Sequence, residues 1–92
     1  METKEIKLRV PDAIQSGTFA NNTMITHSKE EFFIDYIVLA PPGGTVVSRV
    51  IVTPAHFKRI ISTMQDNLNK YEDSFGPVEA SKTPPTNRGV SG

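Results

Sequence analysis

The first half of the chain alternates between apolar and polar positions in a way that is typical of β-strands. Residues 6–10 alternate strictly between apolar and basic side chains, and this period of two predicts a strand with one buried face that Pro11 ends. A weaker alternation over residues 18–26 predicts a second strand, and its central pair, Asn21-Asn22, is expected to mark a β-bulge. The chain therefore opens with strands and not with a helix.

Residues 31–39 are the richest in aromatic and β-branched types and predict the best-defined strand of the protein. The stretch Pro41-Pro42-Gly43-Gly44 follows as a loop, and residues 45–52 (TVVSRVIV) predict a returning strand. Short connections favour an antiparallel meander. The expected sheet has three or four strands.

One long helix is predicted after the last strand. Thr53 is a suitable cap, Pro54 suits the first helical position, and Gly76-Pro77 ends the helix. Between these signals, apolar residues recur at spacings of four, three, four, three and four and form one stripe. The stripe consists of Phe57, Ile61, Met64, Leu68, Tyr71 and Phe75. The predicted fold class is α+β, with an antiparallel meander followed by one C-terminal helix.

The strand at residues 32–39 is apolar on both of its faces, with Asp35 as the one charged interruption. A sheet that is wet on one side would alternate more cleanly, so both faces are expected to be covered. One helix can cover one face, and a second copy of the chain is the expected cover for the other. The alternative is that the helical stripe only covers the sheet of its own chain.

Charges along the helix run against its macrodipole, because Lys58 and Arg59 lie near its start and Glu72 and Asp73 near its end. Two helices packed antiparallel about a two-fold axis near Asp66 would place each basic start beside an acidic end. The sequence therefore predicts that these four residues and the apolar stripe form an interface between copies. The predicted contacts join Phe57 to Phe75, Ile61 to Tyr71 and Met64 to Leu68.

Composition limits the domain organisation and the partners. The 92 residues suffice for one domain, expected over residues 1–75. Residues 76–92 hold three Gly and three Pro among few apolar residues and predict a disordered tail. Ten basic and ten acidic residues give no net charge, which makes nucleic acid an unfavoured partner. With no cysteine, no leader and no membrane span in the sequence, we expect a soluble cytoplasmic protein.

Catalytic and cofactor signatures are weak. His27 and His56 match no triad spacing with the serine and aspartate residues, and two histidines without cysteine cannot build a metal site by themselves. The glycine pair at 43–44 lacks the context of a phosphate-binding loop. Asp35 and Arg49 lie on opposing strands and predict an ion pair across the hairpin, with a ligand-binding charge as the alternative. No enzyme activity, cofactor or metal is expected.

The segments KLRVPD, NNTMITHSKEEFFIDY and VVSRVIVTPAHFKRIISTMQDNLNKYEDSFG resemble a family of short bacterial and archaeal proteins known as domain of unknown function 3467. The resemblance covers about residues 6–76, and its most distinctive part is SRVIVTPAH, residues 48–56. It implies no activity. The succession of strands and one terminal helix is also similar in topology to the export chaperone SecB, although this chain is much shorter.

These observations predict a non-enzymatic, homo-oligomeric module that binds other proteins or peptides, in the manner of a chaperone, through exposed sheet edges or apolar surface. The expected oligomer is a dimer or a larger assembly. Two alternatives stay open, namely a small nucleic-acid-associated regulator and an accessory subunit of a larger assembly.

Overall fold

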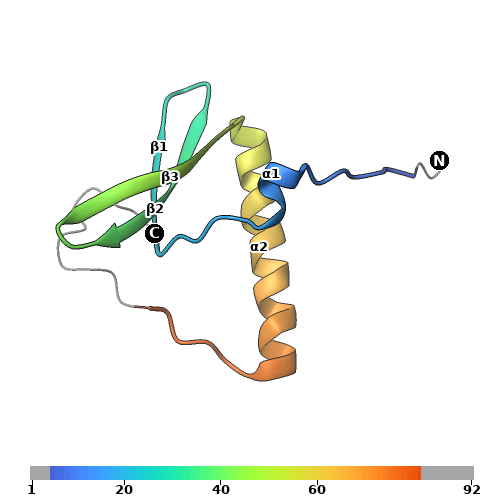
Figure 1. Cartoon of the computed structure of the whole chain (residues 1–92). Helices are drawn as coiled ribbons and strands as arrows, with labels where there is room; N and C mark the ends of the chain where they lie inside the picture. The colour runs from blue at the N-terminus through green and yellow to red at the C-terminus, as the bar shows by residue number, and fades with distance from the viewer. Residues whose placement is uncertain (1–4, 82–92) are drawn as a thin grey trace.

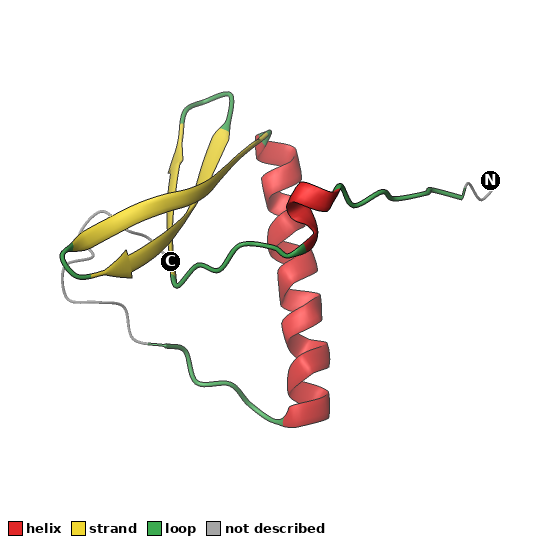
Figure 2. Cartoon of the chain, in the orientation of Figure 1, coloured by secondary structure: helices red, strands yellow, loops and turns green. Residues whose placement is uncertain are grey.

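A computed structural model describes residues 5–81 of the 92-residue chain. It contains a three-stranded antiparallel sheet in the order β1-β2-β3, followed by one long helix, as Figures 1 and 2 show. The α+β class and the meander are thereby confirmed. The elements are α1 (Asp12–Gln15), β1 (Asn22–His27), β2 (Phe32–Ala40), β3 (Gly43–Val52) and α2 (Pro54–Phe75).

The central strand β2 carries the small core of the sheet. Ile34 and Ile37 are 4% and 6% exposed and point to opposite faces, because their positions differ by three and strand side chains alternate. Only these two large apolar side chains of the described residues are buried. The predicted loop between β2 and β3 is shorter than expected, because Gly43 and Gly44 belong to β3 and Pro41-Pro42 alone form the connection, with a cis peptide bond.

Two predictions about the first strands are wrong. Residues 6–10 have no strand partner within the described chain and form an extended segment instead. The sequence also gave no sign of α1. The second strand begins only at Asn22, and the pair Asn21-Asn22 is not a bulge.

The Asn21 side chain instead continues the ladder beyond the end of β1. Its amide nitrogen donates to the Leu39 carbonyl at 3.1 Å, and its Oδ1 accepts from the Leu39 amide at 2.8 Å. This mimics a pair of backbone hydrogen bonds. The register irregularity of the sheet lies elsewhere, at Val47 of β3, opposite Tyr36 and Ile37.

Helix α2 begins and ends where its local signals predict. The Thr53 hydroxyl accepts the backbone N–H of His56 at 3.2 Å, and Pro54 occupies the first turn. At the other end Gly76 has a φ of 95°, which a residue with a side chain rarely adopts, and its N–H donates to the Glu72 carbonyl. Residues 77–81 continue without helix or strand, and residues 82–92 of the predicted tail lie outside the described residues. No helix within residues 5–81 has the length and apolar character to cross a membrane.

The predicted ion pair between β2 and β3 is confirmed. Arg49 lies opposite Asp35 in the register, and its Nε and Nη2 donate to the two carboxylate oxygens at 2.6 and 2.8 Å. Asp35 is 1% exposed, whereas the Arg49 side chain is 57% exposed. The hydrogen bonds from Arg49 hold the pKa of Asp35 below its ordinary value, against the opposing effect of burial.

Replacement of Arg49 should therefore destabilise the protein in a pH-dependent way. Asp35 has a depressed pKa in the folded state, so its contribution to stability is present above the unfolded pKa of about 3.9 and is lost as the pH falls through the folded value. In Arg49→Leu the carboxylate is buried without its partner. We expect a lower denaturant midpoint at pH 7 and a deficit relative to wild type that shrinks below about pH 4.

The double variant Asp35→Leu/Arg49→Leu is the control, because it removes the unpaired charge together with its partner. It should recover part of the midpoint lost in Arg49→Leu. Chemical denaturation at several pH values checks both expectations. An Arg49→Leu deficit that does not change with pH would show that the lost stability does not come from the ionised carboxylate.

Candidate interaction surface

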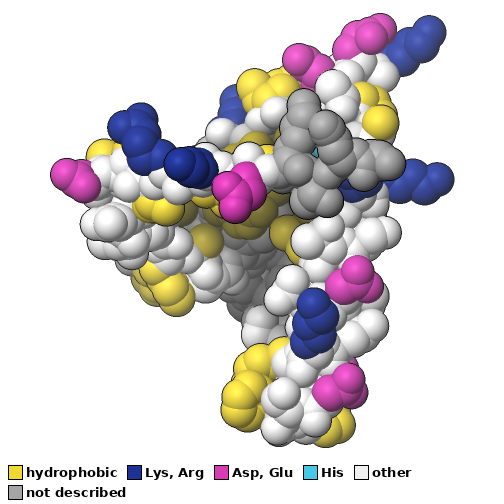
Figure 3. Space-filling view, turned by 90° about the vertical axis from the view of Figure 1, so that its right-hand side faces the viewer, with side chains coloured by type: hydrophobic (Ala, Val, Ile, Leu, Met, Phe, Trp, Pro, Cys, Tyr) yellow, Lys and Arg dark blue, Asp and Glu magenta, His cyan; other side chains and the backbone are white. Residues whose placement is uncertain are grey.

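The apolar stripe of α2 is open to solvent over most of its length. Phe57, at the start of the helix, is the one stripe residue that is half-buried. Its ring stacks on Phe32 with centroids 4.1 Å apart and planes 4° from parallel. The other stripe residues are between 43% and 75% exposed, and hydrophobic side chains are visible at the lower, C-terminal end of α2 in Figure 3. The exposed stripe residues are Ile61, Met64, Leu68, Tyr71 and Phe75.

The alternative was that the stripe only covers the sheet of its own chain. Most of the stripe is instead exposed and does not cover that sheet. Figure 1 shows α2 leaving the end of β3 and running beside the sheet, with its lower half beyond the strands. No residue of α2 is buried. A stripe of this kind lacks the second surface that an amphipathic helix requires for stability in water.

One face of the sheet exposes apolar side chains along β3. We call it the Arg49 face, and the register places Phe33, Asp35 and Ile37 of β2 on it. The β3 residues of this face are between 36% and 52% exposed. They are Val46 and Val47 at the bulge, and Ile51 near the end of the strand. On the Arg49 face, therefore, Asp35 and Ile37 are buried, while the apolar side chains of β3 are exposed around one partly exposed guanidinium.

The four charged residues predicted for the interface do not lie on one side of α2. At 100° per residue, Lys58 and Glu72 flank the same side of the apolar stripe, while Arg59 and Asp73 lie on the opposite face of the helix. Glu72 is half-buried, and its Oε2 accepts the backbone N–H of Val78 at 2.9 Å. Glu72 thus also fixes the chain segment that follows the helix.

The total accessible surface area is larger than that of a compact protein of the same size. The accessible surface is 8270 Å², whereas a folded monomer of 10.1 kDa is expected to expose about 5,300 Å². The radius of gyration is 16.1 Å, compared with about 12 Å for a compact domain of this length. The exposed apolar side chains of the sheet and helix contribute to this excess.

The histidines occupy structural positions. His56 is exposed, and its backbone N–H serves the helix cap. The ring of His27, at the end of β1, lies 5.2 Å from that of Phe32. Within residues 5–81, no group of three or more metal-ligating side chains comes together.

A pocket at the start of β1 is lined by uncharged residues among those described. Its walls come from residues 20–23, Tyr36 and residues 80–81. The side-chain nitrogen of Asn22 is buried there without a hydrogen-bond partner in the structure. The pocket offers hydrogen-bonding groups and apolar contact, and its described lining holds no carboxylate, histidine or basic side chain.

A family described as "Protein of unknown function (DUF3467)" matches residues 1–80 of the chain. The chain belongs to this family. The family resemblance of the sequence segments at residues 6–76 is thus confirmed. No curated protein and no solved structure matches the chain.

The sequence did not reveal that the N-terminal segment would be part of the open surface. Ile6, Leu8 and Val10 are between 54% and 89% exposed. Their alternation is a genuine strand signal, but the signal says nothing about which chain supplies the neighbouring strand. The apolar stripe, by contrast, was found because helical spacing is a local property.

Proposed function

We propose that the DUF3467 protein is a non-enzymatic, homo-oligomeric module that binds other proteins. The observation that supports this most is the open apolar stripe of α2, from Ile61 to Phe75, which no other part of the described chain covers. Exposed contiguous apolar surface of this extent marks interaction sites in folded proteins. The function is thus assembly and binding.

A second copy of the chain is the proposed occupant of the stripe. In an antiparallel helix pair related by a two-fold axis near residue 66, Met64 lies beside Leu68 of the other copy. Phe75 then approaches the Phe32–Phe57 stack of the other copy and extends it. A two-fold arrangement buries the stripes of both copies in one self-complementary contact.

Charge complementarity supports the antiparallel direction. Lys58 and Glu72 lie on the same flank of the stripe, and an antiparallel pair places the flank of one helix beside the same flank of its mate. Lys58 therefore lies next to Glu72 of the other copy on both sides of the two-fold axis. A parallel pair would instead bring like charges to the same level, which is unfavourable.

Substitution of Leu68 by glutamate tests the proposed helix contact. The dimer buries two copies of Leu68, each contributing about 1.5 kcal/mol or more, so Leu68→Glu should raise the dissociation constant at least about a hundredfold. Ser62→Glu, on the polar face of the same helix, adds the same charge and should leave the constant unchanged. Sedimentation equilibrium measures both. A wild-type protein that sediments as a monomer, or a Leu68→Glu variant that assembles normally, would contradict the proposal.

Charge reversal on the helix tests whether the helices pair in the antiparallel geometry or associate only through apolar contact. Lys58→Glu removes two ion pairs per dimer and creates repulsion, so we expect a dissociation constant about fivefold higher, an effect that salt suppresses. Arg59→Glu makes the matched change on the far face and should have little effect. Equal effects of the two substitutions in light-scattering titrations would exclude the proposed flank contact.

The binding of other proteins is proposed to use the Arg49 face and the sheet edges. This surface is apolar with a single guanidinium, which suits extended polypeptide segments better than a phosphate backbone. Such binding resembles the way a chaperone holds unfolded chains. The zero net charge of the chain works against the nucleic-acid alternative.

Fluorescence anisotropy can decide between protein and nucleic-acid partners. A labelled, unfolded polypeptide such as reduced and alkylated lactalbumin should bind the oligomer, and Ile51→Glu on the Arg49 face should weaken this binding at least about tenfold. A labelled DNA duplex should show no binding below micromolar protein at physiological salt. Tight, salt-dependent binding of the duplex without binding of the polypeptide would favour the nucleic-acid regulator.

A further inference from the structure

The N-terminal arm, which we define as residues 5–10, has the sequence of a strand and no strand partner within the described chain. Its apolar residues Ile6, Leu8 and Val10 alternate with Lys7 and Arg9, and all of them are exposed. Exposure of these three large apolar side chains to water is unfavourable. Such a segment is a donor for pairing with a sheet edge.

The sheet offers two outer edges, and that of β3 fits the arm better. β3 is ten residues long, and after the bulge at Val47 its last five residues pair regularly with β2. The five residues 6–10 span about 17 Å, which is comparable to that regular stretch, and a register that sets Leu8 opposite a residue of the Arg49 face, not opposite Val50, keeps most of the arm along it. The edge of β1 is only six residues long, and residues 80–81 lie beside its start. An open edge of this kind is a template for a strand from another chain.

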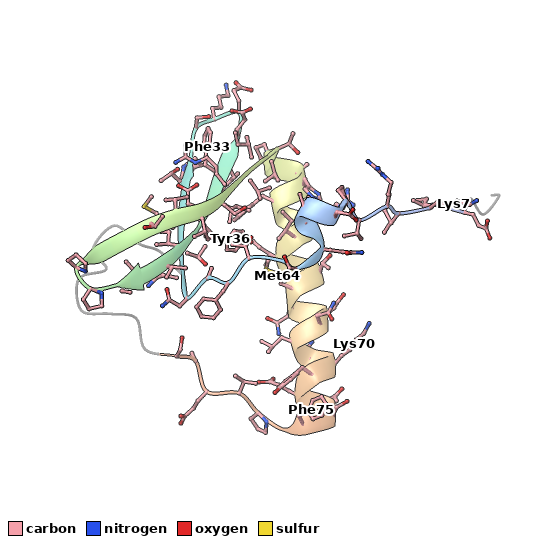
Figure 4. The ribbon with its side chains drawn as sticks, in the orientation of Figure 1. Lys7, Phe33, Tyr36, Met64, Lys70 and Phe75 are labelled. Carbon is pink, nitrogen blue, oxygen red and sulfur yellow. The ribbon has the colours of Figure 1, made fainter. Side chains whose placement is uncertain are left out.

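The arm of a given chain runs away from its own sheet. Figure 4 shows Lys7 at the outer end of the arm, beyond α2 and far from the strands. Helix α1 and the segment to Asn22 separate the arm from β1, and Figure 1 shows this segment passing α2 before it enters the sheet. A second copy can meet the arm where it lies, whereas the same chain would have to fold the arm back across α2.

Charge determines which way the arm's side chains would face. Arg49 lies on β3, and its side chain is more than half exposed. If Lys7 and Arg9 were on the Arg49 face they would stand beside a guanidinium whose carboxylate partner, Asp35, is already engaged, so they would find no acidic partner there. The opposite arrangement places Ile6, Leu8 and Val10 on the Arg49 face, next to the exposed apolar residues of β3.

We propose that the arm of one copy pairs with the outer edge of β3 in a second copy as a fourth strand, with Ile6, Leu8 and Val10 on the Arg49 face. The proposal rests on the proposed function, because it requires that copies of the chain associate. It goes further by naming the segment and the edge that meet. Each sheet is then completed by residues of another copy.

Cysteine cross-linking tests this pairing directly, because the natural chain contains no cysteine. Unlabelled Leu8→Cys is mixed with a ¹⁵N-labelled full-length chain that carries one cysteine on β3, and mixed disulfides are identified by mass after air oxidation. Val47→Cys and Ile51→Cys probe the Arg49 face. Ser48→Cys and Val50→Cys are matched controls on the other face. The first pair should give mixed disulfides at least tenfold faster than the second.

Three results would overturn the proposal. The first is equal cross-linking to both faces, and the second is none to either. The third is rapid closure of the double variant Leu8→Cys/Ile51→Cys within one chain at high dilution, which would return the arm to its own sheet. Sedimentation of the wild-type chain separates the two proposals. An oligomer without cross-linking refutes the arm alone, whereas a monomer refutes both.

Discussion

A single open sheet cannot bury two apolar faces, and this constraint governs the whole molecule. The central strand β2 is apolar on both sides, yet only Ile34 and Ile37 are buried within the described chain. Stable domains place a second layer against each apolar face. Here the one long helix joins the sheet at the Phe32–Phe57 stack and then leaves it. The sheet and the helix each keep an apolar surface that no second layer of the described chain covers.

The ion pair at the centre of β2 fixes the register of this open sheet. A shift of β3 by one residue would move Arg49 to the other face and leave the Asp35 carboxylate buried without a partner. Removing one member of a buried pair is far more costly than a missing surface pair. A sheet with a small core gains little specificity from packing, so we infer that this polar contact supplies much of it. The pair therefore acts in structure, as the sequence interpretation predicted.

The sequence predicted the elements that depend on local signals. Helix α2 was found with its correct ends because Thr53, Pro54 and Gly76 act within one turn of the backbone. The opposition of Asp35 and Arg49 followed from a short hairpin. The one-turn helix α1 and the ladder contact of Asn21 gave no such signal, because each depends on a few hydrogen bonds that composition does not encode.

The N-terminal arm shows why the remaining part could not be predicted. Its alternation indicates a strand with one buried face, and the structure shows the same residues extended and exposed. Strand formation requires a neighbour, and the identity of that neighbour is a non-local property. The same holds for the apolar stripe of α2, since its spacing predicts burial without indicating which surface covers it.

On the proposed assembly, these two features couple folding to association. Apolar surface that is covered only by another copy contributes to stability in proportion to how often that copy is bound. On the proposed assembly, the helix cap and the ion pair define the shape of the isolated chain, and contact between copies supplies the missing layer. The stability of the chain should then depend on its concentration, as it does for dimers whose subunits share a core.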